Sequence, residues 1–160
     1  MALFDDLETM GAAIGRIPSG CSILTAVHDG RSTGILVSWV QQAAFEPPSV
    51  TVCIRRGRAV VGMIDASRRF LLNMIGEDPS ALFKHFGKGF SLEDDAFKGL
   101  SIRDTDFGPL IESSIAHLGC VVKNKVVIAD HDLYVGEVAA AGVVEGAQPY
   151  THLRKSGLTY

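Results

Sequence analysis

The amino-terminal residues carry apolar side chains at spacings of three and four positions. This spacing holds for Leu3, Leu7, Met10, Ile14 and Ile17. Residues with this periodicity share one face of a helix, and a proline at position 18 directly follows them. The pattern therefore predicts an amphipathic helix over residues 3–17 that ends at the proline.

After this helix the pattern changes to short apolar runs separated by turn residues. The runs CSILTAVH and STGILVSWV flank Asp29-Gly30, a pair that tolerates the positive φ of a hairpin turn, so they predict two antiparallel strands. In SVTVCIR, Val50, Val52 and Ile54 alternate with other residues, which places them on one face of a third strand.

The remaining chain continues in the same way. A short helix is expected in RAVVGMIDAS, a strand in RFLLNMI and another helix in SALFKHFG, which Asp78-Pro79 introduces with a capping carboxylate and a first-turn proline. The polar segment 88–108 predicts loop and short helices. Strands return in IAHLGCVVKN, KVVIAD and DLYVGEVAAAGVVEG, and QPYTHLRKSGLTY predicts a last short strand or an ordered extension.

Composition and turn spacing together define the expected fold class. The 160 residues are 47% hydrophobic and 21% charged, which fits one ordered domain over residues 1–160. Short strands with turn signals about every ten residues predict a mainly β fold, an antiparallel barrel with peripheral helices. The strand–helix alternation of a doubly wound parallel sheet is missing, as are the GxGxxG and GxxxxGKS/T nucleotide-binding patterns.

Charge and cysteine content narrow the class of protein. A net charge of −3 gives the surface no electrostatic reason to bind nucleic acid. No apolar run reaches membrane-spanning length, and the acidic start MALFDDLETM lacks the basic region of a signal peptide, so a cytoplasmic protein without a membrane partner is expected. Cys21, Cys53 and Cys120 lie far apart without a CxxC pair, which indicates buried thiols rather than disulfides or a zinc site.

Polar residues follow an apolar strand in GILVSWVQQAAFEPP, residues 34–48. Ser38, Gln41 and Gln42 come where this strand is expected to end, beside Trp39, the only tryptophan of the chain. Such residues either cap a turn or hold a ligand. An apolar wall with amide donors suits a flat aromatic ligand with polar edges. The alternative is a core tryptophan whose indole N–H is bonded to a neighbour.

Three arginines surround a glycine in the segment CIRRGRAVV. Arg55, Arg56 and Arg58 flank Gly57, and a helix is expected to begin near Ala59. Backbone N–H groups at a helix N-terminus carry partial positive charge, and arginine adds bidentate donors, so this combination suits a phosphate group. The alternative is a basic turn that faces water.

A third candidate is the segment ADHDLYVGEV. Asp130, His131 and Asp132 are residue types that bind metals, but neighbouring side chains on an extended chain point to opposite faces, so no metal site is expected. A turn that leaves His131 exposed at the rim of a pocket is the preferred interpretation. Because the chain also lacks a GxSxG nucleophile motif, any enzymatic activity is expected to come from a bound organic cofactor.

Four segments, in order and covering nearly the whole chain, resemble motifs of the flavin reductase-like, FMN-binding split-barrel family. They are GILVSWVQQAAFEPPSVTVCI, RFLLNMI, ADHDLYVGEV and the ending PYTHLRKSGLTY. The matching positions are Gly34, Ser38, Glu46-Pro47-Pro48, Phe70, Asn73, Asp130, His131, Gly136, Glu137 and Val138. The tryptophan at the strand end and the basic tail are most similar to the reductase domain attached to some flavodiiron proteins.

The resemblance implies an antiparallel Greek-key split barrel that binds FMN, as a homodimer with the flavin near the subunit interface. The family's strand end that contacts the ring and phosphate falls on Val37, Ser38, Trp39, Val40, Gln41 and Gln42. Its second phosphate loop falls on Arg55, Arg56, Arg58 and Ala59. His131 matches a position near the open face of the flavin, where it would orient the electron donor as the catalytic residue.

This chain departs from the family pattern at several of these positions. Leu36 replaces a threonine, Trp39 replaces the second serine, and Gln41-Gln42 replace small hydroxyl residues. Amide or backbone donors would therefore have to replace hydroxyls at the phosphate.

The function that the resemblance implies is that of an NAD(P)H:FMN oxidoreductase. Two alternatives remain at this point. The first is an FMN-binding electron-transfer module that takes electrons from a protein partner. The second is a domain on the same barrel that binds another ligand, for instance haem.

Overall fold

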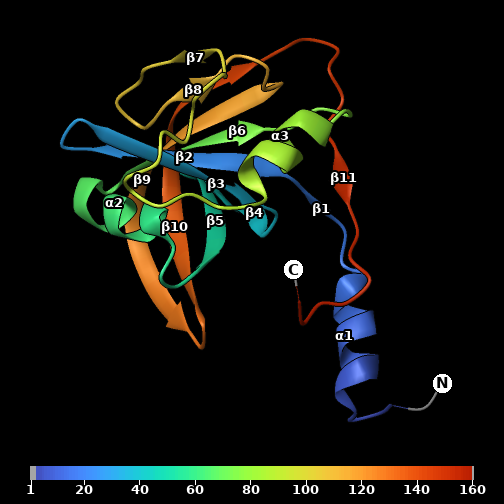
Figure 1. Ribbon diagram of the computed structural model, residues 1–160. Coiled ribbons are helices and arrows are strands. Elements are labelled where there is room, and N and C mark those ends of the chain that lie inside the picture. Colours follow the sequence, from blue (N-terminus) through green and yellow to red (C-terminus); the bar gives the residue numbers. More distant parts are fainter. Residues whose placement is uncertain (1–2, 160) are drawn as a thin grey trace.

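A computed structural model describes residues 3–159 and confirms the predicted mainly β fold. Its main sheet has seven antiparallel strands in the order β3-β2-β6-β9-β10-β5-β4 (Figure 1). These strands are β2 (Ser22–His28), β3 (Arg31–Val37), β4 (Val40–Phe45), β5 (Pro48–Arg55), β6 (Arg69–Met74), β9 (Ala116–Ile128) and β10 (His131–Val143). Two short pairs flank the sheet, β1 (Ser19–Gly20) with β11 (Thr151–His152), and β7 (Ile102–Arg103) with β8 (Leu110–Ile111).

The predicted strands form for the predicted reasons. β2 and β3 are a hairpin whose turn residues Asp29 and Gly30 have φ values of 49° and 73°. On β5, Val50, Val52 and Ile54 are all buried, as their alternation predicts. β9 is one long strand through Asn124, where the sequence suggested two separate runs.

The sheet closes on itself at one corner. β3 and β4 stand at opposite ends of the strand order, but only Ser38 and Trp39 separate them along the chain. The Cys53 backbone N–H donates to the Trp39 carbonyl oxygen at 3.0 Å, which fastens this corner to β5. The two edges are therefore brought together here without pairing along their length, which makes the barrel a split one.

β4 itself is a strand that the sequence pattern did not predict. Its residues VQQAAF do not alternate between apolar and polar, and most of them are exposed because the strand lies at the edge of the sheet. The expectation that the apolar strand ends in a group of glutamines is therefore wrong. The chain breaks at Ser38 and Trp39 and then continues as an edge strand.

Three helices lie outside the sheet. α2 (Ala59–Ser67) and α3 (Ser80–Phe86) form where they are predicted, and the Ser80 backbone N–H donates to the Asp78 carboxylate at 3.2 Å. α2 packs on β2 and β3, while α3 packs its buried Leu82 and Phe86 in a second apolar cluster with Ile23 and Ile75. The segment 88–108 contains no helix.

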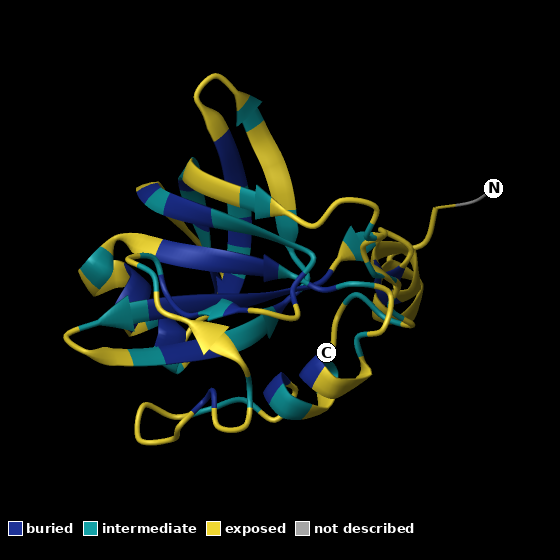
Figure 2. Cartoon of the chain, turned by 90° about the horizontal axis from the view of Figure 1, so that it is seen from above, coloured by how far each residue is buried: buried dark blue, intermediate teal, exposed yellow. Residues whose placement is uncertain are grey.

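α1 (Leu7–Gly15) is shorter than the predicted helix, and its apolar face is not buried. Asp6 caps it by accepting a hydrogen bond from the Thr9 backbone N–H at 2.8 Å. The helix stands away from the sheet (Figure 1) and is mostly exposed (Figure 2); Leu7 is 71% exposed and Ile17 is 64% exposed. Over residues 3–159, none of the helices has the length and apolar character needed to cross a membrane.

Candidate functional site

A cavity of about 610 Å³ lies at the corner where β3 passes into β4. This volume falls in the range of small-molecule binding sites. Four segments supply most of its lining: the end of β3 through Trp39, the end of β5 with the turn after it, α3 with the glycines that follow, and the chain from His152 of β11 onward. Cys21, between β1 and β2, also lines it. Ile35, Leu36, Val37, Phe83 and Phe86 make much of the wall apolar.

The charged residues that line this cavity are all basic. Arg55 and Arg58 come from the turn between β5 and α2, and Arg154 and Lys155 come from the C-terminal tail, residues 153–159. Among the described residues that line the cavity there is no aspartate or glutamate. An apolar cavity whose only formal charges are positive favours a flat ligand that carries an anionic group.

Trp39 contacts both the C-terminal tail and the strand β10. The Arg154 guanidinium lies over its ring at 5.1 Å from the centroid, a cation–π geometry. The His131 ring also contacts Trp39, with the ring centroids 4.6 Å apart. The indole is thus held by a residue of the C-terminal tail and a residue of β10, and it forms part of the cavity wall.

The C-terminal tail is held in place by α1. The Arg154 backbone N–H donates to the Gly15 carbonyl at 3.3 Å, and the Gly157 N–H donates to the Gly11 carbonyl at 2.6 Å. A Cβ on Gly11 would lie 2.7 Å from Ser156 Oγ, and one on Gly15 would lie 2.6 Å from the Arg154 carbonyl oxygen. The two glycines, one helical turn apart, therefore allow the tail to lie directly against the helix.

Half of the ten positions expected to bind the cofactor meet in this one cavity. Val37, Ser38, Trp39, Arg55 and Arg58 all line it. The turn with three arginines and the tryptophan are therefore on the same side of the barrel, and one molecule can contact both.

The other expected contacts lie elsewhere. Val40, Gln41 and Gln42 are on β4 and do not line the cavity, and both glutamines are exposed. Ala59 lines a separate, shallow hollow next to Arg58. Arg56 points away from the cavity and donates to the Asp132 carboxylate at 3.1 Å. The cavity therefore gives no support to direct ligand contacts from these five residues.

His131 is placed differently from the sequence expectation. It was expected to be exposed at the rim of a pocket, but it is 8% exposed and is not among the residues that line the cavity. Its Nδ1 lies 2.9 Å from Asp130 Oδ1, and this hydrogen bond holds the pKa of the Asp130 carboxyl below its usual value of 3.8. The exposed Asp130 and the Trp39 ring thus both hold the imidazole, and His131 supports the tryptophan instead of facing the cavity.

A comparison with protein families shows to which family the chain belongs. The model of the flavin reductase like domain matches residues 14–157, which is most of the chain. The chain belongs to the flavin reductase-like family.

Two kinds of protein are represented among the curated relatives that this chain resembles. It is 36% identical over 163 residues to diflavin flavoprotein A 1 of Synechocystis, covering 99% of this chain but 28% of the relative. It is 30% identical over 141 residues to the reductase component of a 4-nitrophenol 4-monooxygenase/4-nitrocatechol 2-monooxygenase of Rhodococcus opacus, covering 88% of this chain and 74% of that one. The chain spans about a quarter of the length of the diflavin flavoproteins that it matches.

Solved structures share the fold. Nitrilotriacetate monooxygenase component B from Mycobacterium thermoresistibile superposes with a TM-score of 0.79 at 28% identity, covering 90% of this chain and 80% of that one. An NADH:FAD oxidoreductase from Streptomyces globisporus superposes with a TM-score of 0.83 at 19% identity, covering 91% and 86% of the two chains. At that lower identity the second likeness concerns the fold alone.

Sequence reasoning missed two contributions to the cavity of this flavin reductase-like chain. The C-terminal tail supplies Arg154 and Lys155, and its only signal in the sequence was the basic pair in a segment that resembled the family ending. Cys21 and Cys53 also line the cavity, although all three cysteines were expected to be buried core residues. Burial raises the pKa of Cys21 to about 11 and raises that of Cys53, so both are neutral thiols near pH 7 and contribute apolar surface.

Proposed function

We propose that this protein is a flavin reductase that holds FMN in the cavity at the β3–β4 corner and takes electrons from NAD(P)H. The observation that carries the proposal is the composition of the cavity over residues 3–159: apolar walls, one tryptophan, and basic side chains with no aspartate or glutamate among them. An isoalloxazine ring needs the apolar walls, and a phosphate needs the cations. Membership of the flavin reductase-like family supports the same chemistry.

The residues present fit FMN in a specific way. Arg58 is the N-cap residue of α2, makes no side-chain capping hydrogen bond and lines the cavity, and the first turn of α2 has no acidic residue. Its guanidinium therefore favours an anion at this end of the cavity. We assign the phosphate to this end of the cavity. The ring then lies against Val37, Ser38 and Trp39, whose position is fixed by Arg154 and His131.

When bound, the flavin supplies the redox chemistry, accepting a hydride from the reduced nicotinamide and passing electrons to an acceptor. The protein's part is to position the ring, to exclude water with the apolar wall, and to stabilise negative charge with its four cations. His131 acts in this proposal through Trp39, as a positioning residue. A direct role in orienting the donor stays a prediction from the family resemblance.

The first test is a flavin titration of the purified protein. FMN is expected to shift its absorbance spectrum and lose fluorescence on addition of the protein, because the ring enters an apolar cavity beside an indole. NADH or NADPH is then expected to reduce the bound flavin. This reaction is measured as the loss of the absorbance of the reduced nicotinamide. A titration that leaves both the absorbance and the fluorescence of FMN unchanged would rule out the proposed function.

The same preparation separates the two electron sources. If reduced nicotinamide leaves the bound flavin oxidised while a reduced small redox protein reduces it, the electron-transfer module described above replaces the NAD(P)H-dependent reductase. The spectrum of the protein as isolated distinguishes both from a haem protein.

We also propose that α1 contacts a second copy of the chain. Leu7, Met10, Ile14 and Ile17 follow the helical repeat and are between 40% and 71% exposed. Only Ile14 among them also lies against the C-terminal tail, at Gly157, so Leu7 and Met10 are the residues of α1 most open to a partner. An exposed row of large apolar side chains is typical of an interface. A homodimer is also what the family resemblance implies.

Light scattering after gel filtration tests the dimer. The wild type is expected to have twice the 17.1 kDa mass of one chain, and Leu7→Glu with Met10→Glu is expected to have the mass of one chain, because the charges would be buried in the interface. Glu8→Gln on the same helix is the control and should keep the mass of the wild type. A wild-type mass of one chain would contradict the proposal.

A further inference from the structure

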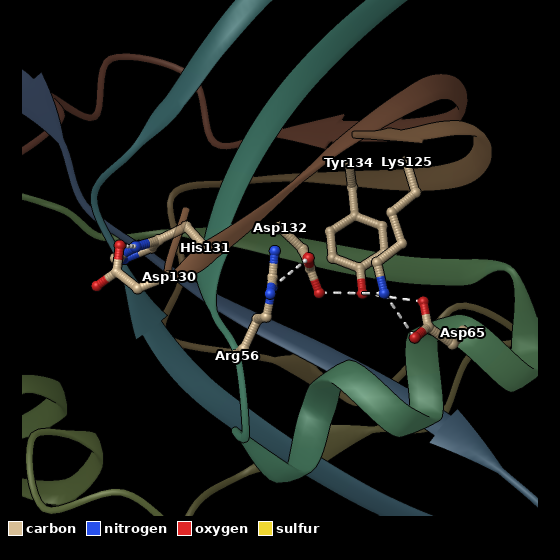
Figure 3. Close-up of polar contacts among 7 residues, drawn as sticks. All are labelled: Arg56, Asp65, Lys125, Asp130, His131, Asp132 and Tyr134. Atoms are coloured by element: carbon tan, nitrogen blue, oxygen red, sulfur yellow. Dashed lines mark hydrogen bonds and ion pairs between the residues drawn. The ribbon is translucent and has the colours of Figure 1, made fainter. Parts of the chain in front are cut away.

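A row of five side chains joined by ion pairs and hydrogen bonds lies outside the lining of the cavity. Its members are Arg56, Asp132, Lys125, Asp65 and Tyr134. The Asp132 carboxylate accepts from Arg56 Nε at 3.1 Å and pairs with Lys125 Nζ at 3.1 Å. Lys125 also donates to Asp65 at 2.7 Å, and the Tyr134 hydroxyl donates to the same carboxylate at 2.9 Å. Figure 3 shows these side chains in a row from the turn after β5 to the helix α2.

Asp132 is the centre of this row. Its side chain is 5% exposed, while those of its partners are between 25% and 45% exposed. Burial alone would raise the pKa of Asp132, but the hydrogen bonds from Lys125 and Arg56 outweigh it and hold the pKa below the usual 3.8. The carboxylate is therefore charged at neutral pH, and its two cations compensate the charge.

The row fixes the segments before and after Arg58, the residue at which the turn passes into α2. On the side of the turn, Arg56 is fixed twice, by Asp132 and by a hydrogen bond from its backbone N–H to the Asp130 carbonyl at 3.0 Å. On the side of the helix, Lys125 and Tyr134 hold Asp65 in the last half of α2. Between them, Gly57 turns the chain with a φ of 79°. Arg58 can keep its place at the cavity because the segments before and after it are tied to β9 and β10.

We infer that Asp132 is a positioning residue for phosphate binding: through Arg56 and Lys125 it fixes the turn and helix that present Arg58 to an anionic ligand. The inference rests on the proposed function, because it assigns the phosphate of FMN to Arg58. The sequence predicted that Arg56 binds the phosphate directly. The inference instead gives Arg56 the role of a residue that holds the turn in place through Asp132.

The test compares FMN with riboflavin, which has the same ring but no phosphate. In Asp132→Asn the Kd for FMN is expected to rise about 10-fold, because small displacements of an oriented binding group have effects of this size or larger. The Kd for riboflavin should stay within about 2-fold, since no side chain of the row lines the cavity and the hydrogen bond between His131 and Asp130 that supports Trp39 is not changed. Lys123→Gln, which breaks the neighbouring ion pair with Glu137 at 3.0 Å on the same two strands, is the matched control and should change neither.

Arg56→Gln provides a second variant that breaks the same link from the exposed side and leaves Asp132 paired with Lys125. It should also raise the Kd for FMN selectively. The double variant should have a Kd for FMN no higher than the higher Kd of the two single variants, because both changes remove the same ion pair. If Arg56 instead contacted the phosphate directly, Asp132→Asn would free it, and FMN would bind as well as before or more tightly.

The outcomes separate the inference from the proposed function. A wild type that binds neither flavin ends both. A wild type that binds FMN and riboflavin, with variants that weaken the two equally or not at all, overturns the inference and leaves the proposed function standing. If Asp132→Asn does not fold, Lys125→Gln takes its place: it removes the other cation that pairs with Asp132 at 3.1 Å, and because Lys125 does not line the cavity, a selective rise in the Kd for FMN supports the inference and an unchanged Kd overturns it.

Discussion

Asn73→Ala is expected to destabilise the protein by about 3–5 kcal/mol, which corresponds to a fall of roughly 10 °C in Tm. Asn73 on β6 is fully buried, and its side-chain oxygen accepts a hydrogen bond from the Ile111 backbone N–H at 2.9 Å. Its amide lies 3.2 Å from the Ile23 carbonyl and 3.4 Å from the Pro109 carbonyl. Removing the side chain leaves the buried Ile111 N–H without its acceptor and takes one donor from each of the Ile23 and Pro109 carbonyls, the second of which keeps the Thr25 hydroxyl at 2.8 Å. Each such loss costs about 1–3 kcal/mol.

The destabilisation is measured by urea unfolding of the purified variant. Gln148→Ala, an exposed amide, is the control and should stay within about 0.5 kcal/mol of the wild type. Stability within 1 kcal/mol of the wild type in Asn73→Ala would show that this hydrogen-bonded asparagine does not fasten the segment 109–111 to the sheet.

Arg58→Ala is expected to weaken FMN binding by about 30-fold, within the range that loss of a charge-assisted hydrogen bond produces. Arg58 lines the cavity and is the N-cap residue directly before α2, so its loss removes a guanidinium from the end assigned to the phosphate. Riboflavin should bind within about 2-fold of its wild-type affinity. Flavin fluorescence titrations with the two ligands give both constants.

A second arginine serves as the control for this measurement. Arg103 on β7 is exposed and lies 3.7 Å from Glu112, outside the cavity, so Arg103→Ala lowers the net charge equally and should leave both affinities unchanged. Equal weakening of FMN and riboflavin by Arg58→Ala would place the phosphate elsewhere and show that Arg58 supports the ring instead.

The strands and the two inner helices could be predicted because their signals are local. Asp29-Gly30 encodes its own hairpin, and the alternation of Val50, Val52 and Ile54 follows from one buried face. β4 could not be predicted in this way, because an edge strand with few buried residues does not need alternation. The helix α1 was predicted with the right period, but periodicity alone does not say what covers its apolar face.

The candidate site was predictable where its residues lie at the ends of strands that the sequence pattern predicts. Trp39 and the arginine turn meet because β3 and β5 converge at the closed corner. The sequence could not show that Arg56 turns toward Asp132, since that depends on the pairing of β5 with β10. The contribution of the C-terminal tail depends on its contact with α1, at the other end of the chain, and no local pattern encodes that contact.

The path of the C-terminal tail has a practical consequence for engineering. Thr159 lies in the cavity wall, so a bulky label attached to the chain at this position would take up room at the cavity. The opposite end of the chain enters α1 away from the sheet (Figure 1). Immobilisation and labelling for the flavin measurements are therefore better made at the exposed residues 3–6, before α1.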